Sequence, residues 1–95
     1  MTDEEKIIYQ KAIDTWGKES QLLQAAEECN ELSKAIIKYV NDRGSASCIE
    51  EETADVEIML KQLRIMLNER RVNGHKQYKL TKLEDMLAGD NDDRS

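Results

Sequence analysis

The sequence predicts an all-α protein, and two features of its 95 residues support that prediction. Apolar residues recur every three or four positions, as on one face of an α-helix, and no segment alternates with the period of a β-strand. The chain has no proline, and its four glycines divide it into four segments with this helical pattern. We therefore expect a single, four-helix bundle-like domain at residues 1–89, followed by a disordered acidic tail at residues 90–95.

The first two expected helices cover residues 3–16 and 20–41, and Gly17 separates them. The polar sequence N-D-R-G-S at residues 41–45 ends the second helix. The apolar stripe of this helix is wide enough to need cover on more than one side, which favours self-association. Its members are Leu22, Ala25, Ala26, Cys29, Leu32, Ile36 and Val40.

A third helix is expected to begin at a cap at Ser47 and to end near residues 70–71. Ser47 and Glu50 have the spacing of a capping box, and the three glutamates at residues 50–52 suit the positive end of a helix. Apolar residues then recur at helical spacing as far as the two arginines, which suit a helix C-terminus. The Asn-Gly pair at residues 73–74 is expected to break the chain.

The last expected helix, at residues 78–87, is only weakly amphipathic. Thr81 and Glu84 have the spacing of a cap, and Gly89 is expected to close the helix. The acidic residues that follow, at 90–95, form the expected tail.

Composition restricts the classes of function. The chain has 14 Lys and Arg against 20 Asp and Glu, a net charge of −6, which argues against direct binding along a nucleic-acid backbone. No apolar run approaches the roughly 20 residues of a membrane span, and the first residues lack the pattern of a signal peptide. We expect a cytoplasmic protein without a membrane or nucleic-acid partner, in which Cys29 and Cys48 are reduced, packed thiols.

Four acidic residues fall in unusual positions on the expected helices. Glu52 and Asp55 lie in the apolar sector of the third helix, and Glu28 shares a side with apolar residues of the second. Glu31 is the neighbour of Glu28 at i, i+3, so two antiparallel helices would bring two acidic pairs face to face. Like charges about 4 Å apart repel by roughly 4 kcal/mol at an effective dielectric near 20, so a divalent cation is expected between them. Carboxylate oxygens suit Mg²⁺ or Mn²⁺, and the alternative is a solvated acidic face.

Other chemistries lack candidate residues. The sequence has no glycine-rich phosphate loop, no zinc-ligand spacing and no nucleophile with a matched base. A di-iron bundle would need two Glu-x-x-His motifs, and the single histidine, His75, lies in an expected loop. Metal-assisted hydrolysis is the catalytic chemistry that remains.

The acidic motifs resemble those of the MazG-type all-α nucleoside triphosphate pyrophosphohydrolases. The resemblance rests on E-E-x-x-E at residues 27–31 and E-T-A-D-V at residues 52–56, and it extends over about residues 16–67. It implies a homo-oligomeric helical bundle, a homodimer or homotetramer, that hydrolyses a (d)NTP to (d)NMP and pyrophosphate with Mg²⁺. Such an enzyme would serve nucleotide-pool housekeeping.

The resemblance also implies roles for individual acids. Carried over position by position, the metal-binding and catalytic residues are Glu28, Glu31, Glu52 and Asp55. Glu27 is an outer candidate for the same site. The acid that acts as general base stays open.

Four lysines are candidates for contacts with the triphosphate: Lys34, Lys38, Lys76 and Lys79. The first two follow Glu31 by about one and two helical turns, where they can reach a phosphate or form ion pairs with nearby glutamates. The two in the C-terminal segment can face phosphate or remain solvated. Trp16 and Tyr39 can stack on a base or pack in the core, so base recognition stays open.

Two non-enzymatic interpretations also stay open. One is a helical oligomerisation or regulatory module whose acids serve solubility or a basic partner. The other is a nucleotide sensor that keeps the metal site without turnover. Hydrolysis separates the enzyme from both, and metal binding separates the sensor from the module.

Overall fold

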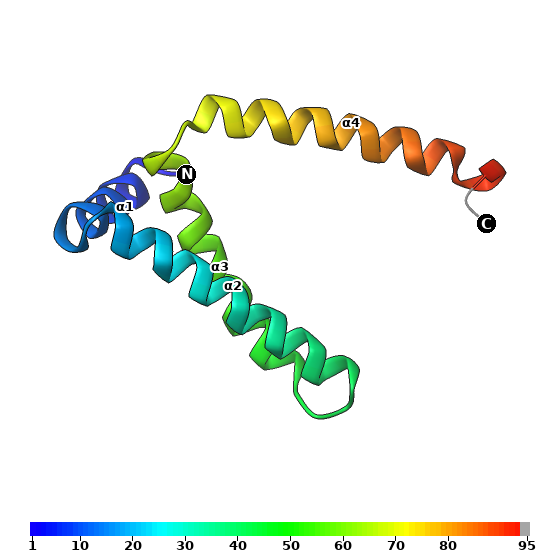
Figure 1. Cartoon of the computed structure of the whole chain (residues 1–95), viewed down its shortest axis with the longest axis horizontal. Helices are drawn as coiled ribbons and strands as arrows, with labels where there is room; N and C mark the ends of the chain where they lie inside the picture. Colours follow the sequence, from blue (N-terminus) through cyan, green and yellow to red (C-terminus); the bar gives the residue numbers. More distant parts are fainter. Residues whose placement is uncertain (94–95) are drawn as a thin grey trace.

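Four α-helices follow one another in the computed structural model, which describes the backbone of residues 1–93 and the side chains of residues 1–89 (Figure 1). They are α1 (Asp3–Trp16), α2 (Lys18–Val40), α3 (Ala46–Met66) and α4 (Glu69–Asp93). Within that part of the chain no residue belongs to a strand. The prediction of an all-α fold with four helices is therefore confirmed.

The most extensive packing is between α2 and α3. These helices lie side by side as an antiparallel hairpin closed by the turn at residues 41–45, and α1 packs on both near the opposite end (Figure 1). The buried apolar residues are Tyr9, Ala25, Ala35, Val56 and Met59. Because this core is small, much of the apolar surface of the helices remains uncovered.

The ends of α1 follow the local sequence signals. The Thr2 hydroxyl accepts a hydrogen bond from the Glu5 N–H at 3.1 Å, and the Glu5 carboxylate accepts one from the Thr2 N–H at 2.9 Å. This reciprocal capping box fixes the start of the helix. Gly17 has a φ of 91°, so the chain can turn there and begin α2 at Lys18, two residues before the expected start.

The cap of α3 is Ser45, and the expected cap at Ser47 is wrong. Ser45 has an extended backbone, with φ −131° and ψ 154°, and its hydroxyl accepts a hydrogen bond from the Cys48 N–H at 3.2 Å. Ser47 already lies in the first helical turn, so its spacing to Glu50 makes no capping box.

The expected boundary between the third and fourth helices is also wrong. α3 ends at Met66, and Asn68 caps α4 by accepting a hydrogen bond from the Arg71 N–H at 3.0 Å. The side chain of Asn73 is used differently, because its oxygen accepts a hydrogen bond from the Arg64 guanidinium of α3. A cap five residues upstream therefore replaces the break expected at the Asn-Gly pair.

Helix α4 runs through both glycines that were expected to interrupt the chain. Gly74 and Gly89 lie within it, and the Thr81 hydroxyl donates to a backbone carbonyl one turn earlier instead of capping a new helix. Of the expected acidic tail, residues 90–93 have a helical backbone that continues α4, and residues 94–95 lie outside the described part.

Helix α4 projects from the rest of the chain. Among the described residues it contacts only α3, near the junction between the two helices, and then diverges from the α2–α3 hairpin (Figure 1). The radius of gyration is 16.8 Å, whereas a compact domain of this length has about 12 Å. None of the helices, over the part of the chain described, combines the length and apolar character of a membrane span.

One side of α2 is uncovered, which corrects the expectation for the cysteines. Cys29 and Cys48 are unpaired thiols, but both are exposed, not packed. Cys29 lies on the same side of α2 as Ile36 and Val40, at spacings of seven and eleven residues, and these side chains are exposed as well. The other side of the expected stripe faces α3 and contains the buried Ala25.

Candidate functional site

Three of the four acids expected at the site converge across the hairpin. One carboxylate oxygen from each of Glu28 on α2 and Glu52 and Asp55 on α3 lies within 4.8 Å of the other two. All three side chains are half-buried. We call Glu28, Glu52 and Asp55 the acidic triad. The antiparallel pairing of α2 with α3 creates it, as the sequence predicts.

Glu31 and Glu27 lie outside this triad. The Glu31 carboxylate is 3.5 Å from the Lys34 ammonium in an exposed ion pair on α2. Glu27 is fully on the exposed side of α2. The structure thus brings together three of the expected acids, keeps Glu31 beside them and leaves Glu27 apart.

The environment of Glu52 disfavours its charged form. Burial raises the pKa of Glu52, and the negative charges of Asp55, Glu28, Glu31 and Glu51 raise it further. The position of Glu28 is fixed by Gln24, whose amide donates a hydrogen bond to the Glu28 carboxylate at 2.8 Å. The triad is therefore a place where negative charge accumulates at a cost, and a cation would relieve that cost.

This cost predicts a pH dependence of stability in the metal-free protein. The pKa of Glu52 in the folded chain lies above the ordinary 4.5. At pH values between these two pKa values, the folded chain therefore binds more protons than the unfolded chain does. The free energy of unfolding therefore falls as pH rises through that window and remains at the lower level above it. We expect Glu52→Gln to remove the fall and to raise Tm at neutral pH in the presence of a chelator.

Thermal unfolding from pH 4 to pH 8 measures this effect. Glu57→Gln is the matched control, because Glu57 is exposed on α3 and does not contribute to the raised pKa of Glu52. The control should retain the fall in stability. An unchanged pH profile in Glu52→Gln would contradict the interpretation of the triad as repulsive.

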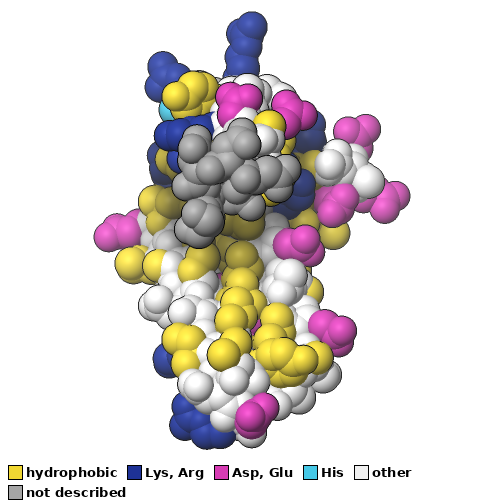
Figure 2. Space-filling view, turned by 90° about the vertical axis from the view of Figure 1, so that its right-hand side faces the viewer, with side chains coloured by type: hydrophobic (Ala, Val, Ile, Leu, Met, Phe, Trp, Pro, Cys, Tyr) yellow, Lys and Arg dark blue, Asp and Glu magenta, His cyan; other side chains and the backbone are white. Residues whose placement is uncertain are grey.

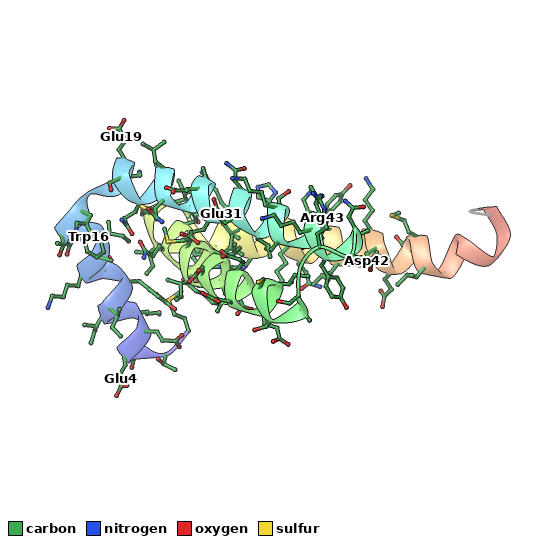
Figure 3. All side chains as sticks on the ribbon, turned by 90° about the horizontal axis from the view of Figure 1, so that it is seen from below. Glu4, Trp16, Glu19, Glu31, Asp42 and Arg43 are labelled. Carbon is green, nitrogen blue, oxygen red and sulfur yellow. The ribbon has the colours of Figure 1, made fainter. Side chains whose placement is uncertain are left out.

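A cavity of about 270 Å³ adjoins the triad, toward the turn of the hairpin. Glu31 and Glu52 line the cavity together with three cations, Lys34, Lys38 and Arg43. Figure 3 shows Glu31 along α2 and Arg43 at the turn. Acids that can hold a cation thus lie next to cations that can hold an anion.

The cavity separates the candidate lysines into two groups. Lys34 and Lys38 line it, whereas Lys76 and Lys79 lie on the projecting α4 and do not. Arg43 is a cavity residue that the sequence did not identify, since residues 41–45 were interpreted only as a helix break. The available signal was a cation in the short turn that joins two acidic helices.

A larger and more open hollow lies where α1 meets α3 and α4. Its volume is about 570 Å³, but Glu69 is the one acid in its lining. A single exposed carboxylate gives a divalent ion too few ligands, so this hollow is not the candidate metal site.

Comparisons of the chain with models of protein families, with curated proteins and with solved structures found no match. The function is therefore inferred from the residues of the chain itself. Chemically, the triad offers oxygen ligands of the kind that divalent ions prefer, and the adjoining cavity offers cationic side chains of the kind that bind polyanions.

Proposed function

We propose that this chain is a Mg²⁺-dependent nucleoside triphosphate pyrophosphohydrolase that converts a (d)NTP to (d)NMP and pyrophosphate. The proposal rests on the acidic triad, which lies beside a cavity lined by three cations. A triphosphate carries several negative charges and is normally bound through a divalent ion together with Lys or Arg. The resemblance of the two acidic motifs to the MazG type points to the same reaction, in nucleotide-pool housekeeping.

The donor set of the triad suits the proposed ion. Its three residues offer carboxylate oxygens, which are the ligands that Mg²⁺ and Mn²⁺ prefer, and it contains no histidine or thiolate of the kind that selects zinc. When bound, the ion would supply Lewis acidity toward phosphate oxygens and lower the pKa of a water molecule.

The residues of the chain have distinct proposed roles around that ion. Lys38 and Arg43 bind phosphate oxygens in the cavity and offset the charge that develops as the phosphoric anhydride bond breaks. The general base that accepts a proton from the attacking water must lie close to the ion but must not coordinate it. We assign that role to Glu31, because its charge acts on Glu52 while its carboxylate lies outside the triad.

The proposal includes a homodimer, which the exposed surface supports. The chain has 7564 Å² of accessible surface, whereas a folded monomer of 11.0 kDa has about 5,600 Å². The excess of roughly 1,900 Å² is larger than the roughly 800 Å² that each partner buries in a standard interface. A second copy of the chain is large enough to cover this surface.

Two apolar surfaces supply the proposed interface. Leu80, Leu83 and Leu87 lie within one sector of α4 and are exposed. Exposed apolar residues on the hairpin include Ile36 and Val40, and Figure 2 shows hydrophobic side chains in a band down this part of the molecule. We propose that α4 of each copy packs on the α2–α3 hairpin of the other.

Charge favours that arrangement over unrelated partners. Residues 69–82 of α4 contain five Lys and Arg and one acid, whereas residues 1–68 contain eight Lys and Arg and 14 acids. Only this first part of α4 is basic, because residues 83–93 contain five acids and no Lys or Arg. The basic part of α4 from one copy therefore meets an acidic body in the other, which is the complementarity expected of a specific interface. In this dimer Lys76 and Lys79 contribute to association, and their contact with phosphate is not required.

Product analysis tests the proposed reaction. Purified protein with Mg²⁺ and a panel of (d)NTPs is expected to release monophosphate and pyrophosphate from at least one nucleotide, and a chelator should stop the reaction. Release of diphosphate and phosphate would identify a different hydrolase. Absence of turnover with every nucleotide would reject the enzyme, and Mg²⁺-dependent nucleotide binding would then favour a sensor over an oligomerisation module.

A further inference from the structure

Two buried glutamines line one hollow at the end of the hairpin that is remote from its turn. Gln21 on α2 and Gln62 on α3 are 6% and 4% exposed, respectively. The side-chain oxygen of Gln62 has no hydrogen-bond partner among the described residues and is shielded from solvent. An unpaired buried acceptor destabilises a fold, and a ligand or a bound water molecule would supply the missing donor.

Both amides line a hollow of about 430 Å³. Trp16, Ser20, Gln24 and Met59 complete its lining. The indole of Trp16 is 64% exposed, so Trp16 is not the core residue that an aromatic at helical spacing usually is. Figure 3 shows Trp16 at the corner between α1 and α2, at the edge of the hairpin.

The hollow is connected to the acidic triad through α2. Gln24 lines the hollow and donates the hydrogen bond of 2.8 Å that holds the Glu28 carboxylate. Gln21 precedes Glu28 by seven residues, which is about 10 Å along the helix. The triad thus has the cation-lined cavity on one side and this amide-lined hollow on the other.

We propose that the hollow binds the base of the nucleotide, an inference that rests on the proposed function. Proteins recognise an unpaired base by stacking it on an aromatic or apolar side chain and by hydrogen bonds to its polar edge. Trp16 and Met59 provide the stacking surfaces. The Gln21 amide both donates and accepts, and rotation of the Gln62 side chain would bring its shielded oxygen to an N–H of the base.

This arrangement gives the nucleotide one direction along the hairpin. The base lies between α1 and the start of α2, the phosphates meet the triad, and the terminal phosphates reach Lys38 and Arg43. Specificity among bases then depends on the donors and acceptors that the two amides present, because a mismatched base leaves a buried amide unpaired.

Fluorescence of Trp16, the one tryptophan of the chain, provides a direct test. The four common nucleosides and their deoxy forms are titrated to millimolar concentration in the presence of a chelator. At least one is expected to quench the fluorescence saturably. Gln62→Leu, which replaces the unpaired amide with an apolar group of similar size, should lower the affinity for that nucleoside by about 10–100-fold.

Gln77→Leu is the matched control, since Gln77 is an exposed glutamine on α4, and it should bind as the unaltered chain does. If Gln62→Leu does not fold, Gln21→Leu supplies the same readout. Quenching that rises linearly and equally in all variants would show that nucleosides only collide with Trp16 and do not bind in the hollow. That result would overturn the proposal. Because nucleosides carry no phosphate and no metal is present, this outcome is independent of the outcome of the hydrolysis assay.

Discussion

Glu52→Gln is expected to abolish most (d)NTP hydrolysis while leaving the fold intact. Burial and the neighbouring acids raise the pKa of Glu52, so a bound cation would relieve the cost of its charge. Loss of one preorganised electrostatic group in an active site typically lowers kcat by about 100–1,000-fold. The measurement is kcat and KM at saturating Mg²⁺, with circular dichroism to confirm the helices.

Stability provides a second readout of the same substitution. In the unaltered chain, Mg²⁺ at ten times its Kd should stabilise the fold by about 1.4 kcal/mol, equivalent to about 6–11 °C in Tm for a domain of this size. Glu52→Gln should lose that shift, although its Tm without metal is raised. Opposite changes in the two conditions distinguish a lost ligand from a damaged fold.

Glu57→Gln again serves as the control, because it removes one negative charge from the exposed surface of the same helix. It should retain both the turnover and the Mg²⁺ response. If Glu52→Gln hydrolyses nucleotides as fast as Glu57→Gln does, the triad is not the catalytic site and the acids form a solvated face.

Most of the fold was predictable because the helical signals are local. The apolar spacing, the absence of proline and the glycine at position 17 predict four helices and the end of α1. The α3–α4 boundary was not predictable in the same way, because the Asn-Gly pair at residues 73–74 is the stronger break signal, whereas the cap in the structure is Asn68. The roles of the two asparagines differ through the contact of Asn73 with Arg64, which becomes visible only in three dimensions.

The geometry of the candidate site was predictable where its residues share a periodic pattern. Glu28, Glu52 and Asp55 lie on helix faces that should be apolar, so their convergence followed from the antiparallel hairpin. Arg43 and Gln62 gave no such signal. Arg43 is placed by the geometry of a turn, and a glutamine on a helix becomes informative only once its burial without a partner is known.

The expected consequence of Leu83→Glu combined with Leu87→Glu is conversion of a homodimer into a monomer. Both leucines are exposed on the projecting α4, and in the proposed dimer each is buried on the partner's hairpin. Two-fold symmetry introduces each substitution twice, so even one leucine lost from each copy costs about 3–6 kcal/mol. Association should therefore weaken by about 100- to 10,000-fold or more.

Light scattering coupled to gel filtration measures the change, from about twice the chain mass of 11.0 kDa to a single chain mass. Tyr78→Glu is the control, because Tyr78 is an exposed residue of α4 that lies about 140° around the helix from Leu83. It should remain dimeric.

Val40→Glu, on the hairpin, should dissociate the dimer as the leucine variants do, because the proposed interface joins these two surfaces. A dimer that survives Val40→Glu but not the leucine changes would mean that two α4 helices pair with each other, and a monomeric unaltered chain would refute the dimer.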